Sequence, residues 1–297
     1  MKIILLIVAF FYYAFNCILI NGIKLKNLLI KKKRKHFSVK LIEIPITTCN
    51  NLSYSTKSIP KFIFQTMYGN KLPSSIHKAI NSWKKMNPNY THFYYDDNAC
   101  REMIIKYFPK KVIRSYDALI PGAYKSDLWR LCALYVFGGV YTDIRTVPLV
   151  PLNEIISKRD NLVLVRDLCL SYIWQGFLAS RPKNCLLKNM IDEICDMVNL
   201  KQYGNNPLDI TGPNRFGRIL NRYMERFDNF PFKVGKYDGY GIRILSHSIF
   251  SQSFVTDGDK KVIKIRCQIS EGEFLKISSK EKYTTAWLNE RVYDSLS

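Results

Sequence analysis

Residues 123–144 read AYKSDLWRLCALYVFGGVYTDI, and this stretch decides the fold. The spacing of leucines in residues 123–137 predicts a strongly apolar helix with one buried stripe. Gly138-Gly139 predicts the end of that helix, because glycine readily takes the left-handed conformation that follows a last helical turn. Residues 140–144 then predict a short strand, so a helix and a strand follow each other directly.

The rest of the chain continues this alternation of helix and strand. Residues 62–64 and 91–95 are typical of buried strands, and a segment with helical spacing follows each of them. Such alternation indicates an α/β sheet with parallel strands. Further along the chain, the sequence predicts a helix over 183–197, loops over 203–259, and strands over 162–165, 262–266 and 274–277.

The N-terminus predicts a membrane anchor. Residues 3–20 read IILLIVAFFYYAFNCILI and contain no charged residue, which just suffices to cross the hydrocarbon of a bilayer. A single-pass anchor over residues 1–22 is the favoured interpretation, with a cleaved signal peptide as the alternative. A basic stem over 23–57 and one globular domain over 58–297 follow. Lysines and arginines after the span favour a cytosolic domain, whereas two N-glycosylation tripeptides suit a lumenal one, so the topology stays open.

The charge of the chain predicts an anionic partner. The formal net charge is +21, and residues 1–40 hold nine Lys and Arg with no acid, which leaves 36 basic against 24 acidic residues in the remainder. Phosphates of a sugar nucleotide, anionic lipids and nucleic acid all suit such a balance. Nucleic acid is the least favoured partner, because the sequence has no fitting motif and no tract of interleaved basic and aromatic residues.

Three polar residues are expected to meet at one edge of the predicted sheet. Asp127 and Arg130 are three residues apart, so they share a face of their helix. Asp143 ends the strand that follows, and ligands of open α/β sheets bind outside the carboxyl ends of the strands. The spacing alone equally allows a simple helix ion pair and an aspartate that caps a turn.

Several motifs in order carry a resemblance to a known family. Residues 59–66 read IPKFIFQT, which resembles the opening I-P-K-I-I-H-Q-T of glycosyltransferase family 32. Residues 123–130 look like its A-x-x-S/A-D-x-x-R helix, and residues 134–145 resemble its L-Y-x-x-G-G-x-Y-x-D-x-D element. The resemblance extends over residues 59–288 and includes Trp287 near its end. It implies a GT-A-type nucleotide-sugar-binding fold, with a Rossmann-like mixed sheet flanked by helices, and usually a retaining transfer.

The resemblance also implies roles for the three converging residues. Asp127 and Arg130 would bind the ribose and sugar hydroxyls of the donor, and Asp143 would be the first carboxylate of the D-x-D element. The second carboxylate of the family meets the Mn²⁺ or Mg²⁺ that bridges the diphosphate, but Arg145 stands at that position here. Asp143, Arg145 and Asp127 are therefore the expected catalytic residues.

The arginine leaves three alternatives open. Arg145 replaces the metal and stabilises the leaving diphosphate, the chain is an inactive relative, or Asp143 and other oxygens still hold an ion. A metal cofactor is accordingly doubtful. The family often has a histidine near its C-terminal tryptophan, and residues 283–287, YTTAW, lack one.

Further donor contacts are expected from three other segments. Phe64, Thr66 and Tyr68 follow the first strand and are expected to contact the nucleotide, with core packing as the alternative. Gln175 matches a position that lines the sugar pocket of the family, with an ordinary loop amide as the alternative. Thr285 and Trp287 are expected to donate hydrogen bonds to phosphate.

Two functions follow from these expectations. The first is a glycosyltransferase that moves a hexose from GDP-mannose or a UDP-sugar to a glycan or glycolipid acceptor near a membrane. It would face either the Golgi or ER lumen or the cytosol. The second is a membrane-anchored relative that has lost catalysis and keeps a nucleotide-sugar pocket for binding or scaffolding.

Overall fold

The computed structural model describes residues 41–49, 58–248, 254–269, 273 and 282–294, all of which belong to one unit from Lys40 to Ser297. The predicted anchor, most of the predicted stem and the strand predicted over 274–277 lie outside these residues. Across the described ranges, no helix combines the length and the apolar character needed to cross a bilayer.

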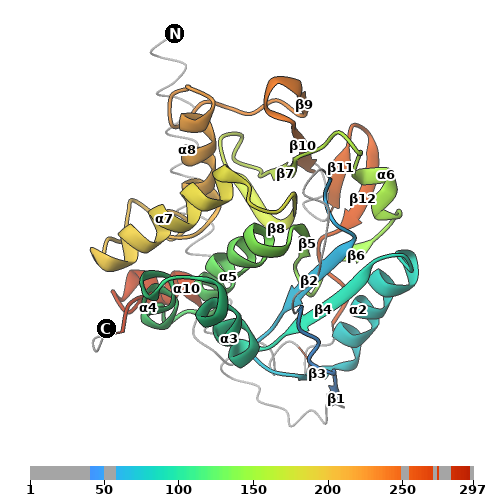
Figure 1. Ribbon diagram of the computed structural model, residues 1–297, viewed down its shortest axis with the longest axis horizontal. Helices are drawn as coiled ribbons and strands as arrows, with labels where there is room; N and C mark the ends of the chain where they lie inside the picture. The colour runs from blue at the N-terminus through green and yellow to red at the C-terminus, as the bar shows by residue number, and fades with distance from the viewer. Residues whose placement is uncertain (1–40, 50–57, 249–253, 270–272, 274–281, 295–297) are drawn as a thin grey trace, which may run out of the picture. The chain divides into compact units, whose positions relative to one another are not determined.

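Ten strands among the described residues form one mixed sheet (Figure 1). Strands β4, β2 and β5 run parallel to one another, and so do β7 and β10. Strand β8 lies between β5 and β7 and is antiparallel to both. The five mutually parallel strands β4, β2, β5, β7 and β10 therefore have their carboxyl ends at the same edge of the sheet. In sheet order the strands are β4 (Thr91–Tyr95), β2 (Phe62–Thr66), β5 (Gly139–Thr142), β8 (Ile173–Ser180), β7 (Leu162–Arg166), β10 (Ile242–His247), β11 (Phe254–Asp257), β12 (Lys260–Lys264) and β6 (Val147–Pro148), with β9 (Gly235–Tyr237) on β10.

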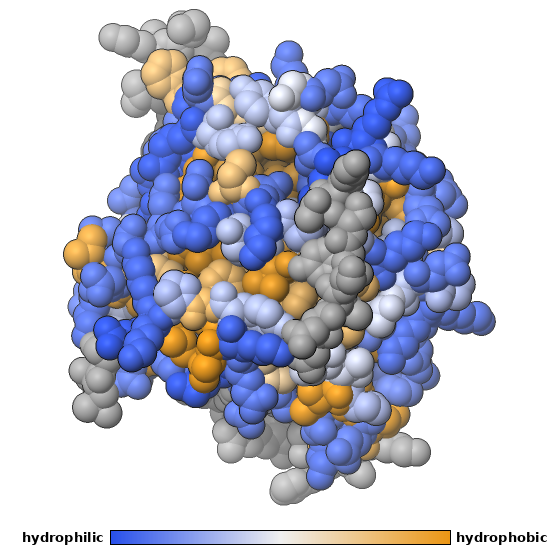
Figure 2. Space-filling model, in the orientation of Figure 1, coloured by the Kyte–Doolittle hydropathy of each residue, from blue (hydrophilic) through white to orange (hydrophobic). Residues whose placement is uncertain are grey.

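Helices cover both faces of this sheet and confirm the predicted α/β class. One core lies between the sheet and helices α3, α4, α5, α7 and α8, whereas α2 and α6 pack on the other face. Figure 2 shows that the face seen in Figure 1 is mostly hydrophilic, as expected from the excess of basic residues. The helices are α2 (Ser74–Met86), α3 (Asp97–Tyr107), α4 (Lys110–Ala118), α5 (Gly122–Phe137), α6 (Leu152–Ile155), α7 (Cys185–Asn199), α8 (Pro213–Tyr223) and α10 (Tyr283–Leu288).

Helix α5 is the central helix of the larger core, and its glycine stop is observed as predicted. The helix ends at Gly138, whose φ is +64°, and β5 begins at the next residue. A Cβ at Gly138 would lie 2.7 Å from the Cδ of Pro182, so the position also requires the absence of a side chain. The Gly-Gly pair therefore sets how closely α5 approaches the sheet.

Two parts of the chain differ from the sequence expectation. The region 203–259, predicted as loops, contains α8, β9, β10 and β11, and Gly212-Pro213 marks the first turn of α8. Part of the segment predicted as stem belongs to the folded unit. Strand β1 (Leu41–Glu43) pairs with β3 (Lys71–Pro73) and leads to the buried Cys49.

The aromatic stack on Phe64 gives a test of the larger core. Phe64 is fully buried, and its ring stacks on Phe93 at 5.2 Å and on Phe137 at 5.9 Å between centroids. We expect Phe64→Ala to lower the free energy of unfolding by about 3–5 kcal/mol, measured by chemical denaturation. The matched change at the exposed Tyr68 should cost less than about 1 kcal/mol. Equal losses from the two changes would contradict this packing.

Candidate active site

The structure brings Asp127, Arg130 and Asp143 together at the carboxyl edge of the sheet. The Nη2 of Arg130 lies 3.2 Å from the Oδ1 of Asp127 and 3.7 Å from the Oδ1 of Asp143. The first two residues stand on α5, and Asp143 directly follows β5. The spatial convergence expected from spacing is thus observed, and the helix ion pair is part of it. The binding roles of the three residues stay predictions.

Arg130 is a buried cation with partners from three elements. Its side chain is only 8% exposed, and its Nη1 donates a hydrogen bond of 2.7 Å to the carbonyl oxygen of Gln175 on β8. Its Nε and Nη2 also bond to the backbone and the hydroxyl of Ser126, and its guanidinium lies 4.3 Å above the ring of Tyr141. A buried charge requires such saturation, so Arg130 fixes the mutual position of α5, β5 and β8.

Hydrogen bonds hold the backbone and one carboxylate oxygen of Asp143, but its side chain is partly exposed to solvent. Its backbone N–H donates to the carbonyl oxygen of Gly176 at 2.9 Å, and its Oδ1 accepts a hydrogen bond of 2.9 Å from the hydroxyl of Tyr141. The side chain is nevertheless 42% exposed. The carboxylate is therefore preorganised and can still accept hydrogen bonds from a ligand.

Thr211, which is far from the other site residues in sequence, also contacts the site. The hydroxyl of Thr211 donates to the Oδ2 of Asp127 at 2.7 Å, and the Nε2 of Gln175 donates to the carbonyl oxygen of Thr211 at 2.7 Å. The Oε1 of Gln175 is buried and has no partner among the described residues. Gln175 thus lies beside the three converging residues and keeps an acceptor, although its binding role is untested.

The environment of Asp127 raises the pKa of its carboxyl group toward neutral pH. Burial raises the pKa of the Asp127 carboxyl to about 6, whereas the charge of Arg130 and the hydrogen bond from Thr211 act in the opposite direction. The nearby charge of Asp143 raises the pKa further. Above about pH 6 the ionised carboxylate can accept hydrogen bonds from sugar hydroxyls at both oxygens, whereas below that pH one oxygen carries a proton and donates instead.

The three residues expected to contact the nucleotide after β2 have different surroundings. Phe64 belongs to the core, so its prediction as a ligand contact is wrong and the alternative of core packing holds, because its ring is stacked between Phe93 and Phe137 in the interior. The hydroxyl of Thr66 donates to the carbonyl oxygen of Tyr95 at 2.9 Å. Tyr68 is 37% exposed and is the one of the three that offers an open surface to a ligand.

Arg145 lies close to Asp143 in sequence but faces another neighbour. Its carbonyl oxygen accepts a hydrogen bond of 2.7 Å from the backbone N–H of Cys267, and within the described part of the chain its side chain forms no ion pair. Burial raises the pKa of the Cys267 thiol, and the adjacent Arg145 guanidinium partly offsets that shift. The Nε of Arg145 is buried without a partner among the described residues.

The described residues around Asp143 do not by themselves form a complete site for a divalent ion. Mn²⁺ and Mg²⁺ require several oxygen ligands, and no group of three His, Cys, Asp or Glu in the described ranges is placed to hold an ion. The carboxylates of Asp127 and Asp143 share the cation of Arg130 between them, and a guanidinium repels a metal ion. The alternative in which Asp143 and other oxygens hold an ion stays a prediction.

The C-terminal helix α10 supplies a residue that the sequence did not single out. The indole N–H of Trp287 donates to the carbonyl oxygen of Tyr203 at 2.8 Å, so the donor predicted for phosphate is already used. Thr285 is exposed on the same helix. Tyr283 packs on Tyr124 at 5.6 Å between ring centroids, and the charge of Asp127 adds to the burial that raises the pKa of its hydroxyl. Tyr283 is therefore a neighbour of the site.

Comparisons with known proteins show similarity to glycosyltransferases. Residues 73–162 match the family model described as "Glycosyltransferase sugar-binding region containing DXD motif". The chain is 25% identical over 193 residues to an initiation-specific alpha-1,6-mannosyltransferase of Candida albicans, covering 56% of this chain and 50% of that one. It is 24% identical over 204 residues to the protein of the same description from Schizosaccharomyces pombe, covering 59% and 51%. The chain thus spans about half the length of these curated relatives.

Solved glycosyltransferase structures are also similar to the chain. The PaToxG glycosyltransferase aligns with a TM-score of 0.45 and 20% identity, over 57% of this chain and 70% of that one. The UDP-bound glycosyltransferase domain of the YGT toxin aligns with a TM-score of 0.37 and 10% identity, over 48% and 63%.

The raised pKa of Asp127 predicts a pH-dependent loss of stability. The ordinary value is 3.8, so between about pH 4 and pH 6 the unfolded chain releases a proton that the folded chain keeps. Stability therefore falls as pH rises through this window, by about 3 kcal/mol in total for a shift of this size. We expect Asp127→Asn to remove that fall, as measured by urea unfolding at pH 4, 5, 6 and 7.

The exposed Asp192, paired with Lys188, provides the control for this measurement. Asp192→Asn should keep the pH dependence of the wild type. An Asp127→Asn protein with the same slope as the wild type would show that this carboxyl titrates normally.

Proposed function

We propose that the chain transfers a hexose from a nucleotide sugar to a glycan or glycolipid acceptor, a proposal that the match of residues 73–162 to a glycosyltransferase sugar-binding region supports. The observation that carries the proposal is the single cluster formed by Asp127, Arg130 and Asp143 at the carboxyl edge of the sheet. In α/β sheets this edge is where nucleotides bind. In the proposed GT-A-type arrangement, the donor lies at this edge, across the carboxyl ends of β2 and β5.

The proposed donor contacts follow from which atoms stay available. Asp127 accepts hydrogen bonds from hydroxyls of the donor, and the exposed carboxylate of Asp143 faces the diphosphate end of the site. The buried, unpartnered Oε1 of Gln175 accepts a hydrogen bond from a sugar hydroxyl, which removes the cost of leaving that oxygen unsatisfied. Tyr68 offers an exposed aromatic ring to the nucleoside.

Arg145 is the residue to which we assign the leaving group. When the bond between the anomeric carbon and the diphosphate oxygen breaks, negative charge builds on the diphosphate, and a fixed cation lowers that barrier. A guanidinium binds phosphate oxygens in a two-pronged geometry, and the unpartnered Nε of Arg145 leaves it donor capacity. The new bond forms between the acceptor oxygen and the anomeric carbon, and the acceptor proton passes to the departing diphosphate. Transfer from the same face retains the configuration and needs no separate base.

The names of the relatives favour mannose as the sugar. Two curated relatives are described as alpha-1,6-mannosyltransferases, and a third, 32% identical over 97 residues, as inositol phosphoceramide mannosyltransferase 3 of Schizosaccharomyces pombe. We therefore propose GDP-mannose ahead of UDP-sugars as the donor. The apolar residues 3–20 support a single-pass anchor that holds the enzyme at a membrane, facing either the Golgi or ER lumen or the cytosol.

Nucleotide release by the purified full-length chain tests this function. We expect release from one donor in a panel of GDP- and UDP-sugars, and we expect it to persist in EDTA because Arg145 stands where the second carboxylate of the D-x-D element would be. Asp143→Ala should lower the rate by about 100-fold or more, since it removes an oriented charged group from the site. Asp192→Asn serves as the surface control.

Each other outcome overturns a stated part of the proposal. Release only with Mn²⁺ would remove Arg145 from its role at the leaving group. Wild-type turnover by Asp143→Ala would remove Asp143 from the site. A folded protein that releases no nucleotide from any donor, with glycan and glycolipid acceptors present, would favour the binding or scaffolding alternative.

A further inference from the structure

Asp209 is a fully buried carboxylate outside the cluster around Arg130. It lies in the segment that joins α7 to α8, and its exposed fraction is 0%. Its Oδ2 accepts a hydrogen bond of 2.9 Å from the backbone N–H of Asn205, and its Oδ1 accepts one of 2.8 Å from the Nδ2 of Asn214. The Nη1 of Arg218 lies 3.6 Å from the same Oδ1. The side chain thus ties both ends of its loop to helix α8.

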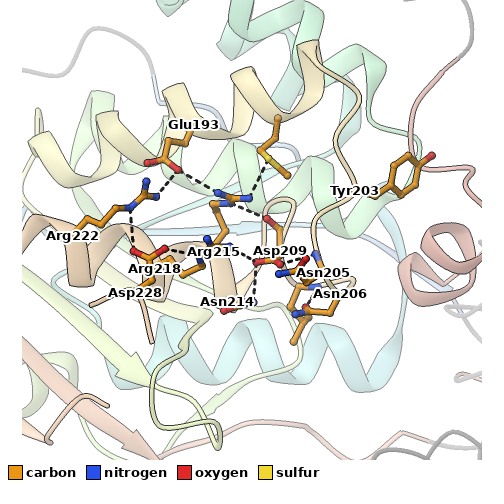
Figure 3. A network of polar contacts seen from close by, with 12 residues as sticks. Glu193, Tyr203, Asn205, Asn206, Asp209, Asn214, Arg215, Arg218, Arg222 and Asp228 are labelled. Carbon is orange, nitrogen blue, oxygen red and sulfur yellow. Dashed lines mark hydrogen bonds and ion pairs between the residues drawn. The ribbon is translucent and has the colours of Figure 1, made fainter. Parts of the chain in front are cut away.

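A chain of charges connects this buried carboxylate to the surface (Figure 3). Arg218 also donates to Asp228 at 2.9 Å, and Arg222 connects Asp228 with Glu193 on α7. Arg215 donates through its Nε to the carbonyl oxygen of Asp209 at 2.8 Å. These partners compensate for the burial of a carboxylate, which is otherwise strongly unfavourable.

The loop that Asp209 holds makes two hydrogen bonds to residues of the site and two to residues of the helices beside it. Besides the contacts of Thr211 with Asp127 and Gln175, the hydroxyl of Tyr124 donates to the carbonyl oxygen of Pro207 at 2.6 Å. The indole of Trp287 donates to the carbonyl oxygen of Tyr203. Residues 203–211 are therefore a common support for α5, β8 and α10 where these elements border the site.

The shape of this loop depends on close contact with Asp209. Gly204 has a φ of +65°, and a Cβ there would lie 2.5 Å from the Cβ of Asp209. The backbone at Gly204 thus packs directly against the side chain of Asp209. Thr211, two residues after Asp209, then donates its hydrogen bond to Asp127. Among the described residues, Asp209 makes no hydrogen bond or ion pair with Asp127, Arg130 or Asp143, so any effect on the site passes through the loop.

We propose that Asp209 is a positioning residue for sugar transfer, which holds Thr211 in place so that the hydrogen bond from Thr211 keeps the Asp127 carboxylate at the correct angle to the donor. The inference rests on the proposed function, because it assigns Asp127 to the donor. An oriented carboxylate binds a hydroxyl well only when its other hydrogen bonds fix its rotamer, and displacement of a supporting group by about 1 Å is enough to weaken catalysis.

A double-mutant cycle tests this route through Thr211. We expect Asp209→Asn and Thr211→Val each to lower kcat/KM for the donor by about 10-fold, mainly through KM. If Asp209 acts through Thr211, the double variant loses no more than about twice what the worse single variant loses. Multiplied losses of about 100-fold in the double variant would overturn the inference, and so would wild-type kinetics in a folded Asp209→Asn protein.

A matched pair of arginines provides a second test that leaves the buried Asp209 unchanged. Arg218 and Arg222 stand one turn apart on α8 and both contact Asp228, but only Arg218 reaches Asp209. Arg218→Gln should raise KM for the donor by about 3-fold and speed amide hydrogen exchange in residues 203–211. Arg222→Gln should change neither, and equal effects from both variants would overturn the inference. A wild-type chain without activity toward any donor would instead remove the proposed function on which the inference rests.

Discussion

The buried guanidinium of Arg130 is the constraint on which the rest of the site depends. A cation in the interior is tolerated only when every donor finds an oxygen, and here the oxygens come from α5 itself, from the end of β5 and from the backbone of β8. Because β8 runs antiparallel between β5 and β7, its Gln175 carbonyl is brought to the same edge as Asp143. One side chain thus fixes two carboxylates and the backbone carbonyl oxygen of Gln175 in a single geometry.

This arrangement explains how a site can work where the second carboxylate of the D-x-D element is absent. The two remaining carboxylates, Asp127 and Asp143, are charge-balanced by Arg130 rather than by an ion. A second arginine, Arg145, stands at the position that a metal-binding carboxylate would occupy. In this account the protein supplies the positive charge for the diphosphate from its own side chains. Thr211 supports Asp127 through a hydrogen bond, and Asp209 in turn holds the loop that carries Thr211.

The sequence predicted those parts of the structure that depend on local pattern. The helix over 123–137, its glycine stop and the strand after it follow from spacing within one short stretch, and so does the meeting of Asp127, Arg130 and Asp143 at a strand end. The role of Phe64 was not readable from the sequence, because its burial depends on stacking against Phe93 and Phe137, which come from other parts of the chain. Thr211 is 84 residues from Asp127, and Asp209 acts through a loop whose fold was predicted to be irregular. Long-range partners of this kind carry no local signal.

Donor binding by an Arg130→Lys variant tests the central claim most directly. Lysine keeps the charge but cannot reproduce the planar fork that joins Asp127, Asp143 and the carbonyl oxygen of Gln175. Titration calorimetry with the donor that the wild type turns over should show a Kd at least about 10-fold weaker in a variant of unchanged circular dichroism. A folded Arg130→Lys protein that binds the donor as tightly as the wild type would contradict the claim that Arg130 organises the site.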